Sequence, residues 1–448
     1  MKRGMATSPF SCYLDFSEAS FIMQGNKIIR LAYGKKGIDL PVRPGWNVTV
    51  VEPRRVAPLS DPVAALTEAL QNPMSGRPLR ERVKPGDKVG IVFNDITRPT
   101  PNELIIHAIL SELAHVPKDS VTLFNALGTH RLNTEEELRG MLGDRLVDQY
   151  RIIQNNAFER DTQVHIGTTV HGNEVWVNRE VLSCDIRILT GFIEPHFFAG
   201  FSGGGKALMP GMAGLTTIMK NHDAEHIANP QASWGITTGN PVWEEVREVL
   251  GMTGPAFLVN VTLDRDKQIT GVFAGDPNTA HDRGMEFVRK TAMVPVVKEF
   301  DMVVTTNSGY PLDLNLYQTV KGMSAAARIV RQGGVILAVA DCWDGIPEHG
   351  NFGRLLREHP DPGEMLEVIH RPGFASLDQW QAQLLAQIRQ KAEVYLYSEN
   401  LGQEELESVG LRKCPHIEEM IESHRKLYGQ ELSICLLPEG PQTIPYLT

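Results

Sequence analysis

Short apolar runs alternate with amphipathic, helix-length segments along this chain, and the alternation limits the folds open to it. In the first half, apolar runs predict strands at 89–95, 120–128 and 185–193, separated by helical patterns at 102–115 and 133–143. The second half repeats the pattern, with strands predicted at 300–309, 333–341 and 394–398 and helices at 316–331, 377–390 and 416–427. Strand–helix alternation is typical of parallel sheets covered by helices. We therefore predict an α/β fold with mostly parallel sheets.

The length of 448 residues exceeds one typical hydrophobic core. We predict two α/β domains, residues 1–290 and 291–448, with the segment EFVRKTAMVPVVKEF (286–300) as the connector. The tail from about residue 428 has too little periodicity for a firm prediction.

Composition excludes several classes of protein. The net charge of −10 disfavours a nucleic-acid or anionic-membrane partner, and no apolar run is long enough to predict a membrane span. The start, MKRGMATSPFSCYLDF, lacks the apolar stretch of a signal peptide. The five cysteines are scattered without a CxxC pair, which favours reduced thiols over a disulfide framework or a cysteine-bound metal. We expect a cytoplasmic protein.

Residues 193–222, IEPHFFAGFSGGGKALMPGMAGLTTIMKNH, hold the densest group of reactive side chains. His196 precedes Lys206 by ten residues, and His222 follows it by sixteen. Glycines in the loop, Gly203 and Gly204 among them, allow positive φ and close approach to a ligand. A lysine at the end of such a loop can contact or bond that ligand, and imidazoles can carry protons or bind a metal.

Two known motifs match this stretch in part. GFSGGGK satisfies the GxxxxGK pattern of a phosphate-binding loop, but Ala207 replaces the hydroxyl residue that would hold Mg²⁺. A glycine-rich turn with a solvated lysine is the plainer alternative. His222 and His226 lie four residues apart, hence on one face if helical, but without the acid position of a zinc protease. One histidine as ligand and the other as bystander is the more economical interpretation.

Further candidates follow other predicted strands. Asp95 and Arg98 lie in NDITRP, where Arg98 could grip a carboxylate or phosphate, or the two could form an ordinary surface pair. His130, in ALGTHR, falls at the same sheet edge as His196, because ligand-binding groups collect at the carboxyl ends of parallel strands.

The second half offers candidates at a helix start. Tyr317, Gln318 and Lys321 lie where a helix N-terminus and a lysine favour an anion, although an ordinary exposed helix start fits as well. Trp380 could be a cleft wall or, more commonly, a core residue.

Taken together, NDITRP, ALGTHR, EPHFFAGFSGGGK, MKNH and YPLDLNLYQTVKGM resemble the nickel-dependent lactate racemase family over roughly residues 20–430. The resemblance implies an active site in a cleft between two α/β domains. It also implies nickel held in a nickel-pincer nucleotide, the pyridinium-3-thioamide-5-thiocarboxylic acid mononucleotide.

The resemblance assigns a role to each candidate residue. Lys206 would anchor the cofactor through a thioamide, and His222 would complete the nickel coordination. The paired acid–base residues would be His130 and His196, and the substrate carboxylate would be held by Arg98 and Lys321 with Gln318 and Tyr317 nearby. The cofactor-binding positions would be Asp95, Gly203, Gly204 and Trp380.

The implied activity is a racemase or epimerase of lactate or a larger 2-hydroxy acid, acting by proton-coupled hydride transfer, with cofactor-synthesis proteins as transient partners. Hydride transfer suits this chemistry because the hydrogen on Cα is a poor acid, and the planar keto acid can take hydride back on either face. Two histidines with ordinary pKa near 6.5 serve the two hydroxyl orientations. Two alternatives remain open: a nucleotide-dependent phosphotransferase using GFSGGGK, and a non-catalytic protein that binds carboxylic acids.

Overall fold

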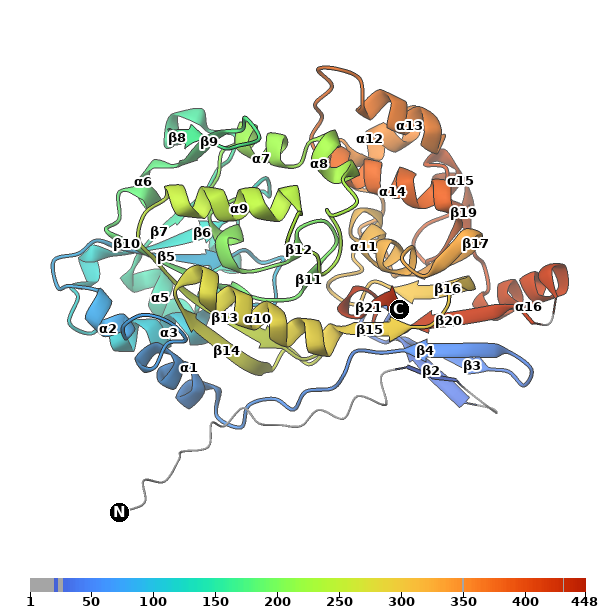
Figure 1. Cartoon of the computed structure of the whole chain (residues 1–448), viewed down its shortest axis with the longest axis horizontal. Coiled ribbons are helices and arrows are strands. Elements are labelled where there is room, and N and C mark those ends of the chain that lie inside the picture. Colours follow the sequence, from blue (N-terminus) through green and yellow to red (C-terminus); the bar gives the residue numbers. More distant parts are fainter. Residues whose placement is uncertain (1–19, 23–26, 349, 430) are drawn as a thin grey trace, which may run out of the picture.

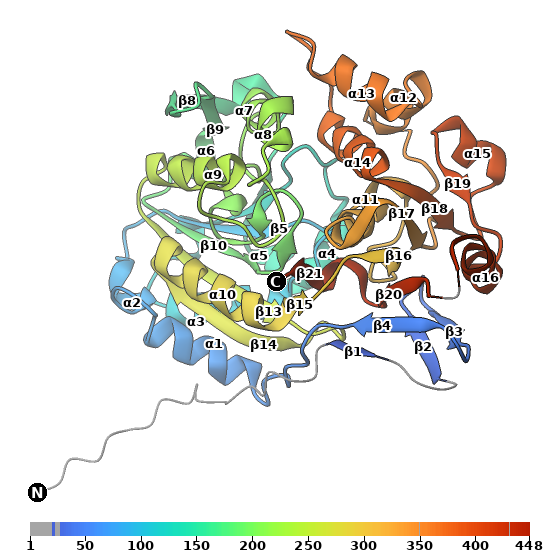
Figure 2. The same cartoon turned by 45° about the vertical axis from the view of Figure 1, so that its right-hand side comes forward.

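Two large sheets with helices on both faces stand side by side in the computed structural model, which describes residues 20–22, 27–348, 350–429 and 431–448 (Figures 1 and 2). Most strand pairs in both sheets are parallel. The predicted α/β fold is confirmed.

The first sheet has six strands in the order β14-β13-β10-β5-β6-β7. They are β14 (Ile269–Gly275), β13 (Ala256–Leu263), β10 (Ile186–Phe192), β5 (Val89–Asn94), β6 (Val121–Ala126) and β7 (Arg151–Gln154). All neighbours are parallel except β13 and β14. The central strands are buried on both faces, which explains why they are continuous apolar runs in the sequence.

Helices cover both faces of this sheet. Ile91 faces one layer, formed by α1 (Pro62–Gln71), α3 (Asn102–Glu112) and α4 (Glu135–Leu142). Val92 faces the other, which holds α7 (Leu215–Asn221), α9 (Pro241–Met252) and β9 (Glu174–Asn178). The other elements of this half are α2 (Leu79–Arg82), η1 (Lys118–Ser120), α5 (Asp144–Gln149), η2 (Arg160–Thr162), β8 (Gln163–Thr168), α6 (Arg179–Leu182), β11 (Pro195–His196), β12 (Gly200–Phe201), η3 (Gly204–Ala207), α8 (Ala224–Ala228) and α10 (Pro277–Ala292).

The second sheet has seven strands in the order β1-β4-β20-β16-β17-β18-β19. They are β1 (Ser20–Ile22), β4 (Asn47–Val51), β20 (Ser433–Leu437), β16 (Phe300–Thr306), β17 (Val330–Val339), β18 (Ala392–Tyr397) and β19 (Arg412–Lys413). One face packs on α11 (Leu316–Ala326), α12 (Phe352–Glu358), α13 (Pro362–Ile369), α14 (Gln379–Lys391) and α15 (Gln403–Ser408). The other packs on β2 (Lys27–Leu31), β3 (Ile38–Val42) and α16 (Ile417–Tyr428).

The N-terminal segment belongs to the sheet of the C-terminal half. Strand β4 lies parallel to β20, and Val48 pairs with Ile434. Figure 1 shows this as blue strands beside red ones, after which the chain crosses to the first sheet. The domain boundary predicted from the sequence placed residues 1–290 in one domain. It did not foresee this pairing, because no local pattern marks a contact between strands almost 400 residues apart. The boundary near residue 290 stays a prediction.

Two segments differ from their sequence interpretation. The predicted connector 286–300 is instead the last turns of α10, the strand β15 (Met293–Val296) and the start of β16. The tail that gave no firm prediction supplies β20, the short η4 (Gly440–Gln442) and β21 (Ile444–Leu447), which pairs with β15. Strand β20 is a central strand, so the end of the chain completes the second core.

No helix in the described ranges is both long enough and apolar enough to cross a bilayer. Cys184, Cys342, Cys414 and Cys435 are unpaired and buried, as expected for reduced thiols, and Cys12 lies outside the described residues.

Strand β20 should be essential to stability. Leu436 is fully buried between β4 and β16, so Leu436→Ala should lower the free energy of unfolding by about 2–5 kcal/mol through lost contacts and a cavity. Denaturant unfolding measures this change. Leu427→Ala, at a side chain that is 76% exposed, is the control and should change stability by less than about 0.5 kcal/mol.

Candidate active site

Three neighbouring parallel strands, β10, β5 and β6, end at one edge of the first sheet and deliver most of the candidate residues. Opposite them, α11 and α14 contribute residues from the second half. The combined cavity is lined by Asp95, Arg98, His130, His196, Gly203, Lys206, His222, Tyr317, Gln318, Lys321 and Trp380. Of the residues predicted from the sequence, only Gly204 is not part of this lining.

His130 is fixed by a carboxylate. Its Nδ1 lies 2.6 Å from Oδ2 of Asp95, a residue that is only 4% exposed. Burial alone would raise the pKa of Asp95, but the charges of His130 and Arg98 and the bond from His130 outweigh it and hold this pKa below its ordinary value. An ionised Asp95 accepts the Nδ1 proton, so Nε2 of His130 is left with a lone pair. His130 is thereby arranged to accept a proton.

His196 is held in the opposite state. Its Nδ1 accepts backbone N–H groups of Phe198 (3.5 Å) and Ala199 (3.2 Å). A neutral ring with an accepting Nδ1 carries its proton on Nε2. Burial, followed by the nearby cations, lowers the pKa of His196 well below its ordinary value, so the ring is neutral near pH 7. His196 is therefore arranged to donate a hydrogen bond from Nε2, because a neutral imidazole is too weak an acid to give up that proton near pH 7.

The glycine loop is shaped for close approach. Gly203 has φ of +80°, and a Cβ there would lie 2.5 Å from Oδ1 of Asn260. Gly204 has φ of +59° and a Cβ there would meet His281 at 2.3 Å, so this glycine packs away from the cavity. Asn260 fixes the turn by accepting the Gly204 N–H at 2.8 Å. No side chain other than hydrogen fits either position.

The loop is not a phosphate-binding loop of the nucleotide-hydrolase type. Lys206 lies in η3, a 3₁₀ helix of four residues, and the next α-helix begins only at Leu215. A phosphate-binding loop leads into a helix whose N-terminus faces the phosphates. The geometry thus disfavours the phosphotransferase alternative.

Three cationic side chains share the cavity: Arg98, Lys206 and Lys321. Burial, followed by the charge of Arg98, lowers the pKa of Lys206 to about 7 and that of Lys321 to about 7. Neither lysine forms an ion pair within the described residues, and the nearby Asp95 is already bonded to His130. An unpaired buried cluster of cations is a site for an anion.

Two phenylalanines that were not predicted from the sequence lie among the imidazoles and lysines of the cavity. Phe197 stacks on His196, with ring centroids 4.7 Å apart, and its ring faces Lys321. Phe198 lies between Lys206, 5.8 Å from its ring centroid, and His222, 4.9 Å from it. Their position directly after His196 was the sequence feature that could have identified them.

Tyr317 and Trp380 join the two helices of the second half. The indole N–H of Trp380 donates to the hydroxyl of Tyr317 at 3.0 Å, and Trp380 packs against His222 with ring centroids 5.1 Å apart. Trp380 thus forms the wall of the cavity beside His222.

His222 ends α7 and presents one nitrogen to the cavity. Its Nδ1 lies 3.1 Å from the carbonyl oxygen of Ile218, which leaves Nε2 with a lone pair. Burial lowers the pKa of His222 to about 3, so the ring is neutral. His226 belongs to the next helix, α8, and a turn at Asp223 separates it from His222, so the condition for one shared helical face is not met. The interpretation of one histidine as a bystander stays a prediction. No group of three His, Cys, Asp or Glu side chains in the described structure could hold a metal ion, so a metal bound at His222 would have fewer than three such protein ligands.

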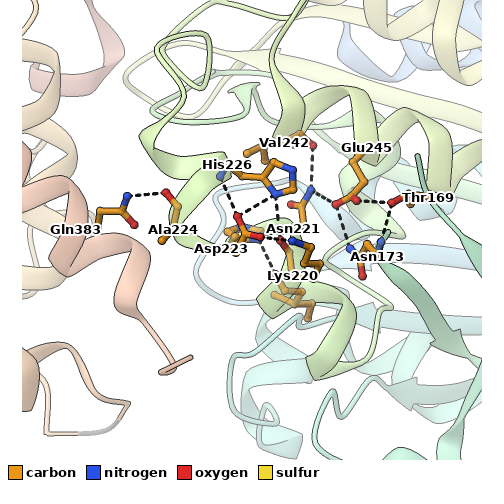
Figure 3. Close-up of polar contacts among 12 residues, drawn as sticks. Thr169, Asn173, Lys220, Asn221, Asp223, Ala224, His226, Val242, Glu245 and Gln383 are labelled. Atoms are coloured by element: carbon orange, nitrogen blue, oxygen red, sulfur yellow. Dashed lines mark hydrogen bonds and ion pairs between the residues drawn. The ribbon is translucent and has the colours of Figure 1, made fainter. Parts of the chain in front are cut away.

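A buried carboxylate supports the end of α7 (Figure 3). Glu245, with no exposed surface, accepts Thr169 at 2.7 Å, Asn173 at 3.0 Å and Asn221 at 2.7 Å. Asn221 directly precedes His222. Three neutral donors from three segments thus fix the backbone that carries the imidazole.

Comparisons with known proteins agree with this geometry. The family model of the lactate racemase N-terminal domain matches residues 33–235, and that of the C-terminal domain matches 296–444. The chain is 33% identical to lactate racemase of Thermoanaerobacterium thermosaccharolyticum over 84% of its length and 88% of the relative's. It is 35% identical to lactate racemase of Lactiplantibacillus plantarum, covering 83% of this chain and 88% of the relative.

Solved structures give the same result. The lactate racemase apoprotein of T. thermosaccharolyticum superposes with a TM-score of 0.88 at 31% identity, covering 94% of this chain and all of that one. A Thermotoga maritima protein shares the fold alone, with a TM-score of 0.67 at 19% identity, covering 88% of this chain and all of that one. The fold and these relatives define an enzyme of the isomerase class, a racemase. The chain belongs to the lactate racemase family, as its motifs predicted.

The support beneath His222 can be tested through Glu245. Glu245→Ala leaves three buried donors without an acceptor and should lower the free energy of unfolding by about 3 kcal/mol or more. Glu245→Gln should cost less, because its carbonyl oxygen can still accept both asparagine amides. Glu248→Gln, one turn along α9, retains an acceptor for the Val170 N–H and is the control. Equal stability of all three variants in denaturant unfolding would contradict the role of this network.

Proposed function

We propose that this enzyme interconverts the stereoisomers of a 2-hydroxy acid, lactate or a larger one, using a nickel-pincer nucleotide bound covalently to Lys206. One observation carries the proposal: a buried, unpaired lysine, two imidazoles in opposite hydrogen-bonding states and a third imidazole face one cationic cavity. A non-catalytic acid-binding protein would need the cations but not this arrangement of imidazoles.

The residues present fit such a cofactor. Lys206, with a pKa of about 7, has a substantial neutral fraction at neutral pH, and a neutral amine can form an amide-type bond. The Nε2 lone pair of His222 suits a borderline metal such as nickel, and the glycines of the loop admit a planar group close to the backbone. When bound, the group would accept hydride from the substrate Cα and return it.

The side chains of the protein then carry the protons and the charge. Nε2 of His130 accepts the hydroxyl proton of one stereoisomer while the substrate carboxylate lies between Arg98 and Lys321. After the planar keto acid turns over, its oxygen lies at Nε2 of His196, and the imidazolium form of His196 donates the proton that completes the new hydroxyl. The opposite direction begins with neutral His196, whose ring proton must lie on Nδ1 so that Nε2 can accept the hydroxyl proton. Gln318 and Tyr317 line the carboxylate side of the cavity.

Lys206 is the first test. After co-expression with the cofactor-synthesis proteins, intact-mass spectrometry should show an adduct on the native chain, together with bound nickel and conversion of a single 2-hydroxy acid stereoisomer. Lys206→Ala should lose all three, while Lys220→Ala, on the exposed side of α7, should retain them. A native chain with neither adduct nor nickel under these conditions would overturn the proposal.

The pH dependence of KM should show whether Lys321 binds the substrate carboxylate. Its ammonium is charged below its pKa of about 7 in the free protein and neutral above it, so attraction of the substrate carboxylate weakens as pH rises. KM should therefore increase above pH 7, by up to about tenfold per pH unit until the bound anion restores the charge. Arginine stays charged, so Lys321→Arg should flatten the KM profile. A native KM that is constant from pH 6 to 9 would show that Lys321 does not bind the carboxylate.

A further inference from the structure

The start of α14 holds one residue of the active site, Tyr317 of α11. Trp380 donates its indole N–H to the Tyr317 hydroxyl, and the side-chain amide of Gln381 donates to the Tyr317 backbone carbonyl. Asp378, the residue directly before the helix, adds a third contact, because its carboxylate accepts a hydrogen bond from the Tyr317 hydroxyl. Three side chains at one helix start thus contact a single tyrosine.

Asp378 precedes α14 without capping it. Aspartate is favoured at this position because its carboxylate accepts a backbone N–H of the helix that follows. Four other aspartates in the described ranges do so, each in front of its own helix: Asp61, Asp223, Asp276 and Asp361. Asp378 makes no such bond, so its carboxylate serves a different contact.

The backbone of Asp378 accounts for the difference. Its φ of +64° is left-handed, whereas the four capping aspartates have negative φ. This conformation is unfavourable for residues other than glycine, and it persists where the surrounding structure requires it. The neighbouring loop leaves room for the carboxylate, since a Cβ at Gly350 would lie 1.9 Å from Oδ2 of Asp378. Backbone strain and a missing side chain thus both serve the placement of this carboxylate.

These contacts engage the hydroxyl proton of Tyr317. An indole N–H only donates and a carboxylate only accepts, so the Tyr317 oxygen accepts from Trp380 and its single proton points to Asp378. Burial, followed by the charge of Asp378, raises the pKa of Tyr317, so the phenol keeps this proton. Tyr317 therefore has no proton left to donate to a substrate carboxylate, unlike the cations Arg98 and Lys321.

Trp380 connects Tyr317 to His222. The ring of Tyr317 packs edge-on against the fully buried Phe352, with centroids 5.3 Å apart, and its hydroxyl is held by Asp378. The Tyr317 oxygen in turn fixes the indole N–H of Trp380, whose ring packs on His222. A continuous series of contacts therefore runs from the Asp378 carboxylate to the imidazole.

We infer that Asp378 is a positioning residue, whose carboxylate orients the Tyr317 hydroxyl and, through Trp380, the imidazole of His222 toward the cofactor. Tyr317 then supports the cofactor side of the cavity and does not bind the substrate carboxylate. The catalytic consequence rests on the proposed function, whereas the series of contacts belongs to the protein chain alone.

The contacts can be tested on the cofactor-free protein by NMR. A sample labelled with 15N-tryptophan should give six indole N–H signals, of which Trp380→Phe identifies one. Tyr317→Phe should move the Trp380 signal because the acceptor is lost, and Asp378→Gly should move it in the same direction. Lys267→Gly also replaces a left-handed residue, with φ of +65°, but lies outside the active-site cavity and should leave this signal in place.

The holoenzyme reveals the catalytic consequence. Asp378→Gly should lower kcat about tenfold and change KM less than about threefold, because Arg98 and Lys321 still bind the substrate carboxylate. Asp378→Asn should retain about a third or more of the native kcat, since its amide oxygen can accept the phenol proton and asparagine tolerates a left-handed backbone. In a Tyr317→Phe background, Asp378→Gly should lower kcat no further. Lys267→Gly should match the native enzyme.

The alternative results are distinct. A Trp380 signal that is the same in the native protein and in Asp378→Gly would overturn the inference. So would an equal loss of kcat in Asp378→Asn and Asp378→Gly, or a loss in Asp378→Gly that persists without the Tyr317 hydroxyl, because Asp378 would then act through its charge or through the fold alone. If the native chain carries neither adduct nor nickel, the proposed function fails, and the NMR comparison still decides whether Asp378 positions Trp380.

Discussion

Repulsion among buried cations is the constraint on which the rest of the site depends. Arg98, Lys206 and Lys321 face one cavity. Asp95 in this cavity is bonded to His130, and Glu194, whose charge acts on both lysines, forms no ion pair with a described residue. A protein tolerates such a group when an anion or a covalent bond completes it. In the proposed holoenzyme, the amide bond at Lys206 would remove one charge, and a substrate carboxylate would compensate one of the two that remain. The cluster is therefore preorganised for what it binds.

The same cluster helps to keep the imidazoles of His130 and His196 different. His130 has a carboxylate behind it and is 41% exposed, whereas His196 has backbone N–H groups behind it and the cations close by. The first presents a lone pair to the cavity and the second presents an N–H. A racemase needs one of each in each direction, so the pair must exchange roles in the opposite direction. The N–H groups of Phe198 and Ala199 oppose that exchange at His196, which makes the two directions unequal in their proton steps.

Sequence patterns predicted what is local and periodic. Buried parallel strands are apolar runs, so β5, β6 and β10 could be placed, and the rule that ligands gather at strand ends brought Asp95, Arg98, His130 and His196 together. The features that were not predicted are contacts between segments far apart in the sequence. The pairing of β4 with β20 and the partners of Glu245 each join segments far apart in the chain, and no spacing encodes such contacts. The four-residue spacing of His222 and His226 likewise did not reveal the turn, set by the Asp223 cap, that breaks the helical period between them.

Both halves of the molecule position His222. From the first half, Glu245 holds Asn221 and with it the end of α7. From the second half, Trp380 packs on the imidazole, and one turn further along α14 Gln383 donates to the carbonyl oxygen of Ala224 at 2.8 Å (Figure 3). A metal bound at Nε2 would therefore be aligned only when α14 lies against α8. The contact that completes the ligand geometry also brings α11, with Lys321, over the cavity. The packing of α14 and α11 against the first half thus positions both His222 and Lys321.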